Sequence, residues 1–180
     1  MFIAKKLRET NIAEYLLYMW QVEDLIRAYD FSIDKLKDSY LSQFQLPKKQ
    51  QEELEEWYSN IIKMMQSENV TAQGHIQINK NCILLLTDLH HQLINSTKYP
   101  FYSAAYYKTL PYIIELRRKG ERTDLPEIEN CLDMLYGVMM LRLQNKAIRK
   151  ETEKAVQDVT TFIGMLSDYY LKDKKTPLEF

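Results

Sequence analysis

The sequence predicts an all-α protein, a single-domain bundle of about six to seven amphipathic helices. Glycine contributes only 4 and proline only 5 of the 180 residues, and these two residue types form most tight turns. Apolar residues recur at helical spacing along most of the chain. No stretch alternates apolar and polar residues for long enough to form a strand. Few turn residues and one dominant period therefore predict long helices with short connections.

The length of 180 residues fits one domain, and a hydrophobic content of 46% supplies enough apolar surface for one core. We expect this helical domain to occupy residues 1–172. The segment 173–180 is charged, contains a proline and lacks helical periodicity, so we expect a disordered tail there.

The first predicted helix opens with a capping box formed by Asn11 and Glu14 and runs to about Tyr29. Apolar residues cover so much of its circumference that we expect it to be central in the bundle. Its main stripe consists of Ile12, Leu16, Met19, Val22, Ile26 and Tyr29.

Two further helices follow before residue 68. Ser32 can cap a shorter helix that reaches about Phe44. Pro47 marks a break and the start of the next helix, because proline is favoured at a helix N-terminus and disfavoured inside. The inward residues of this helix are Leu54, Trp57, Ile61, Met64 and Met65.

The fourth predicted helix covers about residues 71–95, and the fifth follows Pro100. A basic run before Gly120 marks the end of the fifth helix, because cations stabilise the last turn and glycine suits the position just beyond it. Pro111 lies inside this helix and should kink or divide it, since proline cannot donate the backbone hydrogen bond.

The last two predicted helices complete the bundle. Asp124 and Glu127 start the sixth helix with carboxylates near its positive end. The seventh covers about residues 150–171. Glycine is unfavourable inside a helix, so we interpret Gly137 and Gly164 as points of close contact between helices.

The charge balance excludes several classes of protein. With 24 basic and 25 acidic residues, the net charge is −1, so we expect no nucleic-acid binding and no attraction to an anionic membrane. The N-terminus lacks an apolar stretch of signal-peptide length, and no apolar run approaches the ~18 residues of a membrane span. We therefore expect a cytoplasmic protein. Cys82 and Cys131 lie in apolar helical contexts and are expected to be reduced core residues.

The common catalytic motifs are missing from the sequence, which contains no dinucleotide fingerprint, no P-loop and no nucleophile elbow. All three histidines lie on the fourth predicted helix. Asp88 and His91 have a spacing that carboxylate-bridged metal sites use, but they lie away from the apolar stripe, and no second helix carries a histidine. We therefore expect no metal site and no cofactor.

Polar residues interrupt the apolar faces of three helices. Glu23 and Arg27 adjoin the apolar surface of the first helix, His75 and Asn79 lie on the stripe of the fourth, and Arg142 continues the apolar line of the sixth. Buried polar groups need partners, because an unpaired one costs about 1–3 kcal/mol. One interpretation is a structural network, in which Glu23 pairs with Arg27 and His75 or Asn79 bonds across the bundle. The other is a pocket that orients a small ligand of unknown identity.

Tyrosines cluster around the fifth helix. The chain has 13 tyrosines, and Tyr99, Tyr102 and Tyr106 share one helical side. Tyrosine combines apolar area with a hydroxyl group, which suits half-exposed positions and interfaces. The cluster is either the rim of the core or a surface for a protein partner or a homodimer.

Four segments resemble an uncharacterised all-helical family from anaerobic gut bacteria, a domain of unknown function. The resemblance covers essentially the whole chain and implies an all-helical fold and a cytosolic setting, but no activity, cofactor or catalytic residue. The segments are WQVEDLIRAY (20–29), NKNCILLLTDLHHQL (79–93), YPFYSAAYYKTLPYIIELRRKGE (99–121) and CLDMLYG (131–137).

The sequence does not define an activity. It favours a non-enzymatic cytosolic scaffold or partner-binding protein, with a homodimer as one form. The alternative is a small-molecule-binding or enzymatic bundle with a polar pocket around His75, Asn79 and Arg142.

Overall fold

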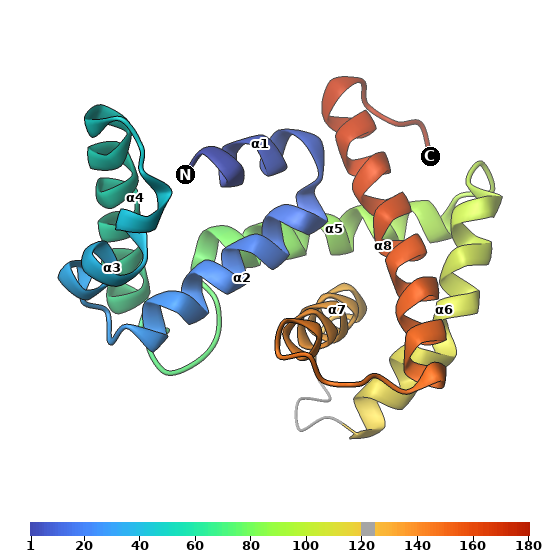
Figure 1. Ribbon diagram of the computed structural model, residues 1–180. Coiled ribbons are helices and arrows are strands. Elements are labelled where there is room, and N and C mark those ends of the chain that lie inside the picture. Colours follow the sequence, from blue (N-terminus) through green and yellow to red (C-terminus); the bar gives the residue numbers. More distant parts are fainter. Residues whose placement is uncertain (120–124) are drawn as a thin grey trace. The chain divides into compact units, whose positions relative to one another are not determined.

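The computed structural model describes residues 1–119 and 125–180, which form eight α-helices and one short 3-10 helix and contain no strand (Figure 1). The all-α prediction is confirmed, and the number of helices is slightly above the expected six to seven. The elements are α1 (Phe2–Thr10), α2 (Ile12–Ala28), α3 (Ile33–Ser39), η1 (Leu41–Phe44), α4 (Lys48–Ser67), α5 (Gln77–Asn95), α6 (Pro100–Lys119), α7 (Glu127–Leu143) and α8 (Lys150–Lys175).

The additional helix is α1, which the sequence pattern did not indicate. Its nine residues bury Ala4, whereas the neighbouring Phe2 and Ile3 are exposed. Isolated helices shorter than about 12 residues are marginal in water. We infer that α1 depends on packing against the rest of the chain, which a local pattern does not reveal.

Helix α5 begins at Gln77, later than the predicted start near residue 71. The preceding segment includes Asn69 and Gly74, whose φ angles are 57° and 85°. These left-handed conformations are incompatible with a continuing right-handed helix. The predicted start was therefore wrong, and a loop precedes α5 instead.

Other predicted helix starts are confirmed, but the helix predicted to run from Ser32 to about Phe44 ends at Ser39 and is followed by the separate 3-10 helix η1. The Ser32 side chain accepts a hydrogen bond from the backbone N–H of Lys35 at 3.3 Å, as an N-cap does. Helix α4 starts directly after Pro47. The predicted stop at Gly120 and the predicted cap at Asp124 lie outside the described residues.

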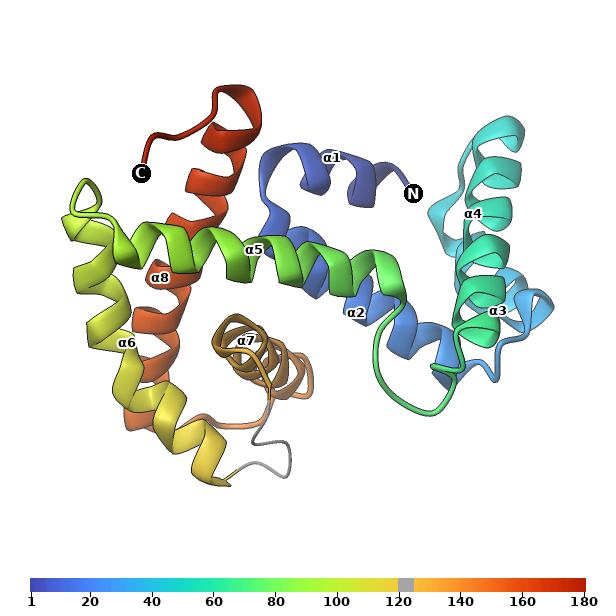
Figure 2. The ribbon, with the colours of Figure 1, turned by 180° about the vertical axis from the view of Figure 1, so that it is seen from behind.

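Pro111 does not divide α6, which is assigned as one helix through this position and changes direction along its length (Figures 1 and 2). Because proline has no backbone N–H, the carbonyl of Tyr107 receives no bond from it. Both residues are exposed, so water can solvate the backbone there.

The chain separates into two compact units, which we describe individually. The N-terminal unit comprises residues 1–8 and 14–81, and the C-terminal unit comprises residues 9–13 and 82–180. In the N-terminal unit, α3 packs against η1 and α4. In the C-terminal unit, α8 packs against both α6 and α7, and α6 also contacts α7. Its core is built around Leu86, Tyr102, Ile113, Ile128, Leu132, Val159 and Phe162.

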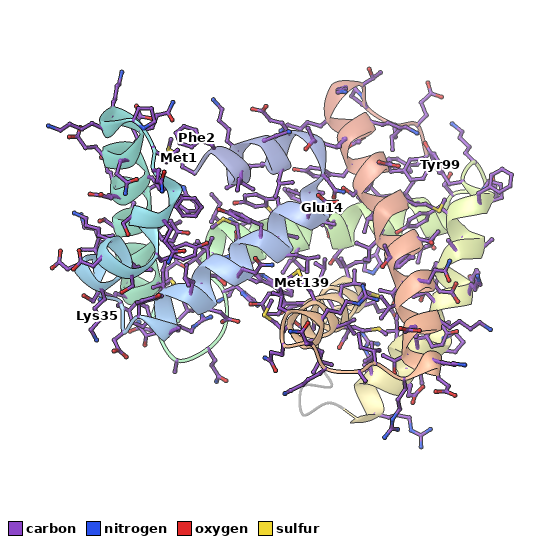
Figure 3. The ribbon with its side chains drawn as sticks, viewed as in Figure 1. Met1, Phe2, Glu14, Lys35, Tyr99 and Met139 are labelled. Carbon is purple, nitrogen blue, oxygen red and sulfur yellow. The ribbon has the colours of Figure 1, made fainter. Side chains whose placement is uncertain are left out.

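Helix α8 ends at Lys175, within the tail predicted to begin at residue 173. The hydroxyl of Tyr99 donates a hydrogen bond to the backbone carbonyl of Glu179 at 2.9 Å, and the rings of Tyr99 and Phe180 lie 5.8 Å apart. Figure 3 places Tyr99 close to the N-terminal end of α6. The domain boundary at residue 172 and the disorder of the tail stay predictions.

The predicted role of Gly137 and Gly164 as close-contact points was wrong. A Cβ atom built on either glycine meets no other atom within 4 Å. Both positions therefore have room for a side chain, and close helix packing does not require glycine at either one.

Replacing Gly164 with alanine is expected to raise the free energy of unfolding by about 0.5–1 kcal/mol, because alanine loses less backbone entropy in a helix. Urea denaturation measures the change. The matched comparison is Gly74→Ala, which should lower stability by about 1 kcal/mol because its φ of 85° strains an L-residue. A loss of stability in Gly164→Ala would contradict the open environment of this glycine.

Candidate functional site

The polar residues predicted to form a pocket meet around Glu23, a fully buried carboxylate on α2. Oε1 of Glu23 accepts hydrogen bonds from the backbone N–H of Ile76 at 3.1 Å and from Nδ2 of Asn79 at 2.8 Å. Oε2 lies 2.6 Å from Nδ1 of His75. A carboxylate oxygen accepts and does not donate, so Nδ1 carries the proton in this pair. One carboxylate thus holds the start of α5 and the two residues that precede it.

The His75 ring is fixed from a second side by Trp20. The two rings are stacked, with centroids 4.2 Å apart and planes inclined by 12°. The His75 side chain remains 17% exposed, whereas Asn79 is fully buried. Within the described part of the chain, Oδ1 of Asn79 accepts no hydrogen bond. The cluster is therefore a tightly packed hydrogen-bond network with one unused acceptor.

Arg27 holds the loop before α5. Its Nη2 donates to the backbone carbonyls of Val70, at 3.0 Å, and Gly74, and its Nε donates to the carbonyl of Thr71 at 3.3 Å. Its Nη1 pairs with the carboxylate of Asp24 at 2.8 Å. The guanidinium group has five N–H donors in one plane, which suits several carbonyls converging on it. Arg27 thus fixes the loop that replaces the predicted first turns of α5.

Four of the five predicted pocket residues are brought together in the N-terminal unit: Glu23, Arg27, His75 and Asn79. The predicted ion pair between Glu23 and Arg27 does not form, because Arg27 pairs with Asp24 and Glu23 bonds to α5 and the preceding loop.

Arg142 differs from the other predicted pocket residues. It belongs to the C-terminal unit and is exposed in the last turn of α7. The expectation that Arg142 lies on a buried face was wrong. The apolar line of α7 continues in sequence, but Leu141 and Leu143 beside it are also exposed, so core packing ends before the last turn.

The three tyrosines predicted to form an interface have different environments. Tyr102 and Tyr106 are buried in the C-terminal unit, where the rings of both contact Phe162 on α8. Tyr99 is partly exposed and contacts Tyr169 on α8. Tyr102 and Tyr106 therefore lack the exposed surface that an interface residue needs.

A second polar cluster, which the sequence patterns did not single out, surrounds His90 on α5. Its Nδ1 lies 2.7 Å from the hydroxyl of Tyr102 and its Nε2 lies 3.7 Å from Oε2 of Glu127. Oε1 of Glu127 lies 3.6 Å from Nη1 of Arg117, whose Nη2 donates to the carbonyl of Leu125 at 2.8 Å. The sequence feature that could have identified this cluster is the position of His90 on the apolar stripe of α5.

Burial controls the protonation of this second cluster. Desolvation lowers the pKa of His90 to about 4, against a smaller opposing effect of the Glu127 carboxylate. Burial and a hydrogen bond to Glu127 raise the pKa of Tyr106 to about 12. Burial also raises the pKa of the Cys131 thiol well above its usual range. His90 is only 1% exposed, so its ring is not open to a substrate in this conformation.

The outer face of α6 consists of Phe101, Ala104, Tyr107, Pro111 and Ile114, all of which are exposed. Phe101 is 82% exposed, Tyr107 63% and Ile114 51%. Their spacing of three or four residues, with Phe101 at the N-terminal end, places them along one side of the helix. Single exposed apolar residues are ordinary, whereas a contiguous group of large ones marks an interaction surface.

The described residues contain no group of three or more His, Cys, Asp or Glu side chains that could hold a metal ion. Cys82 and Cys131 are buried and are not joined in a disulfide, as expected. Among the described helices, none has the length and apolar character needed to cross a membrane.

Comparisons with known proteins match the chain at the level of its family. Residues 1–177 match the model of a family described as Domain of unknown function (DUF4924). Neither the curated proteins nor the solved structures give a match to this chain.

Proposed function

The chain belongs to the family described as Domain of unknown function (DUF4924), and from this premise we propose that it is a non-enzymatic protein that binds a partner through the outer face of α6. The observation that carries the proposal is the exposure of Phe101, Tyr107 and Ile114 along this face. Large apolar and aromatic side chains dominate the energetics of interfaces because their burial removes much apolar area from water.

The buried polar groups support a non-enzymatic role. Glu23, His75 and Asn79 form hydrogen bonds with one another or with the backbone. His90 is enclosed in the core of the C-terminal unit, and burial keeps the thiol of Cys131 protonated at neutral pH. Catalytic groups need contact with a substrate, which the buried Glu23, Asn79, His90 and Cys131 do not offer. His75 is 17% exposed, but its ring is held by Glu23 and Trp20.

The partner that we propose is a second copy of the chain. The five residues that define the outer face of α6 are uncharged, and the charged residues Glu115 and Arg118 lie next to Pro111 and Ile114. A twofold axis pairs the same patch on both subunits, and an apolar helix face can form such a self-complementary contact.

We also propose that the protein is cytosolic and that it originates from an anaerobic gut bacterium.

Sedimentation velocity tests this assignment. The chain should show a sedimentation coefficient that rises over about 1–500 µM, a range that covers the affinities of small interfaces. Replacing Phe101 and Tyr107 together with serine should abolish the rise, because it removes the two most exposed aromatic rings of the face.

The control replaces Phe44 with serine. Phe44 is 44% exposed but lies in η1 of the N-terminal unit, so this variant should sediment as the parent chain does. A parent chain that remains monomeric at the highest concentration would exclude the homodimer. A rise that persists after both α6 substitutions would place the contact elsewhere.

The alternative of a ligand pocket around His75, Asn79 and Arg142 has weaker support. His75 and Asn79 are bonded to Glu23, and Arg142 is exposed in the other unit. The unused Oδ1 of Asn79 is the one feature that favours a ligand there.

A further inference from the structure

A hollow on the outer face of α6 lies beside Pro111. It has a volume of about 400 Å³, and its described lining consists of Pro111, Ile114, Glu115 and Arg118. A cavity of about 150 Å³ already holds a benzene molecule, so the hollow has room for an aromatic side chain. All four lining residues are exposed, and the hollow is therefore open to another molecule.

The chemistry of this lining suits an aromatic ring. Pro111 and Ile114 supply apolar surface, and Arg118 supplies a guanidinium group. A guanidinium is planar and weakly hydrated, and the face of an aromatic ring is electronegative, so the two groups stack favourably. We therefore expect the hollow to prefer an aromatic side chain to an aliphatic one.

The same helix carries an exposed aromatic ring that cannot reach the hollow of its own chain. Phe101 is 82% exposed and lies 13 positions before Ile114, which corresponds to about 20 Å along a helix. A phenylalanine side chain is far shorter than this distance. A ring that fills the hollow must come from another molecule, and a second copy of the chain supplies both a ring and a hollow.

We propose that two copies of the chain pair their α6 helices antiparallel, so that Phe101 of each copy occupies the hollow of the other. This inference rests on the homodimer proposed above and adds its orientation and its contacts. A twofold axis perpendicular to the helices makes the two contacts equivalent. The register that sets Phe101 opposite Ile114 also sets Ala104 opposite Pro111. The short Ala104 side chain lets the two helices approach, and antiparallel helix dipoles attract each other.

The exposed area of this face predicts a weak dimer. Phe101 and Tyr107 are 82% and 63% exposed, which leaves about 300 Å² of aromatic surface if each residue offers about 200 Å² in full. A standard interface covers about 800 Å² on each partner, so the contact belongs to the small and weak class. Lys108 is also exposed, but its Nζ lies 2.7 Å from Oδ1 of Asp158 and its charge is paired.

Paramagnetic relaxation between copies tests the orientation. A nitroxide is attached to Thr97→Cys, an exposed position just before α6, and this unlabelled copy is mixed with the ¹⁵N-labelled parent chain. Cys82 and Cys131 are buried and should not react with the label. Antiparallel pairing should cause signal loss at the amides of residues 114–118 of the labelled copy. Reducing the nitroxide should restore these signals.

Substitutions test the contact between Phe101 and Arg118. Phe101→Leu and Arg118→Gln should each weaken self-association by about fivefold or more in sedimentation velocity, because each dimer contains two such contacts. If the ring touches the guanidinium, the double variant should weaken association by less than the product of the two factors. The matched control is Arg149→Gln, which removes an exposed arginine of the same unit outside the described lining and should leave association unchanged.

The outcomes separate this inference from the homodimer itself. Signal loss at residues 97–101 without loss at 114–118 would indicate a parallel pairing and would overturn the inference, while the homodimer would stand. Two substitution factors that simply multiply in the double variant would also overturn it. A chain that remains monomeric at the highest concentration would overturn both proposals.

Discussion

Replacing Glu23 with leucine is expected to lower the free energy of unfolding by about 3–5 kcal/mol, a large part of the ~5–15 kcal/mol that stabilises an ordinary domain. Leucine fills much of the same volume but accepts no hydrogen bond. The buried N–H of Ile76 and the amide of Asn79 would lose their acceptor, and His75 would lose its partner. Each buried polar group left unsatisfied costs about 1–3 kcal/mol.

Urea denaturation measures this loss, and hydrogen exchange locates it. The amide of Ile76 donates directly to Glu23, so its protection should fall more than that of amides within α4. The matched control is Glu56→Leu, an exposed glutamate in the same unit. It should change stability by about 0.5 kcal/mol or less. A Glu23→Leu chain within about 1 kcal/mol of the parent would refute the role of Glu23 as the anchor of α5.

The isosteric variant Glu23→Gln separates hydrogen bonding from charge. The amide oxygen can still accept from Ile76 and Asn79, and the new NH₂ group can donate to Nδ1 of His75 after a change of tautomer. We expect a loss of about 1–2 kcal/mol, smaller than for leucine, because most bonds persist without the ionised acceptor.

The fold class and most helix positions follow from local patterns. Apolar periodicity, Ser32 and Pro47 located the early helices, because these signals act within a few residues. The start of α5 illustrates the limit of local patterns. Arg27 is more than 40 residues away in sequence, yet it binds the carbonyls of Val70 and Thr71 that a helix would otherwise use. A contact of that range is invisible to a local pattern.

The absence of long-range contacts from local patterns also explains why the predicted interface included Tyr102 and Tyr106, which are buried. Helix α6 carries two apolar stripes, one with Tyr102, Tyr106 and Ile113 and another with Tyr107 and Ile114. Either stripe could face the core by its spacing. The structure buries the first and exposes the second, because the first packs on Phe162 of α8. Only the packing partner decides between two faces of similar composition.

The candidate site was partly predictable for a related reason. Glu23, His75 and Asn79 could be grouped because each interrupts an apolar stripe and therefore needs a buried partner. The sequence did not show which of these groups form pairs, because Glu23 and Asp24 both lie three or four residues before Arg27 on the same helix.

The second large effect expected from the structure concerns pH and His90. Its pKa is about 4 in the folded chain, because burial disfavours the charged imidazolium, whereas an exposed histidine titrates near 6.5. Groups facing it from other helices are Glu127 on α7 and Tyr102 and Tyr106 on α6. Next to it on α5, His91 adds a smaller effect that also lowers the pKa.

Between these two pKa values the unfolded chain binds a proton at His90 that the folded chain does not. The free energy of unfolding should therefore fall as the pH falls from about 6.5 to 4, by about 2–3 kcal/mol, and this contribution should level off below pH 4. At neutral pH, His90 is uncharged in both states and carries no such penalty.

The variant His90→Asn isolates this effect, because asparagine can still accept from the Tyr102 hydroxyl but cannot be protonated. Urea denaturation at several pH values should show a shallower loss of stability for His90→Asn than for the parent chain between pH 6.5 and 4. The control is His91→Asn, which removes the exposed neighbouring histidine and should keep most of the parent's dependence. The carboxylates that do not face His90 are common to all three chains, so their contributions cancel in the comparison. Equal pH dependence in His90→Asn and the parent would mean that His90 is protonated in the folded chain at an ordinary pH, which its enclosure by Tyr102, Tyr106 and Phe162 argues against.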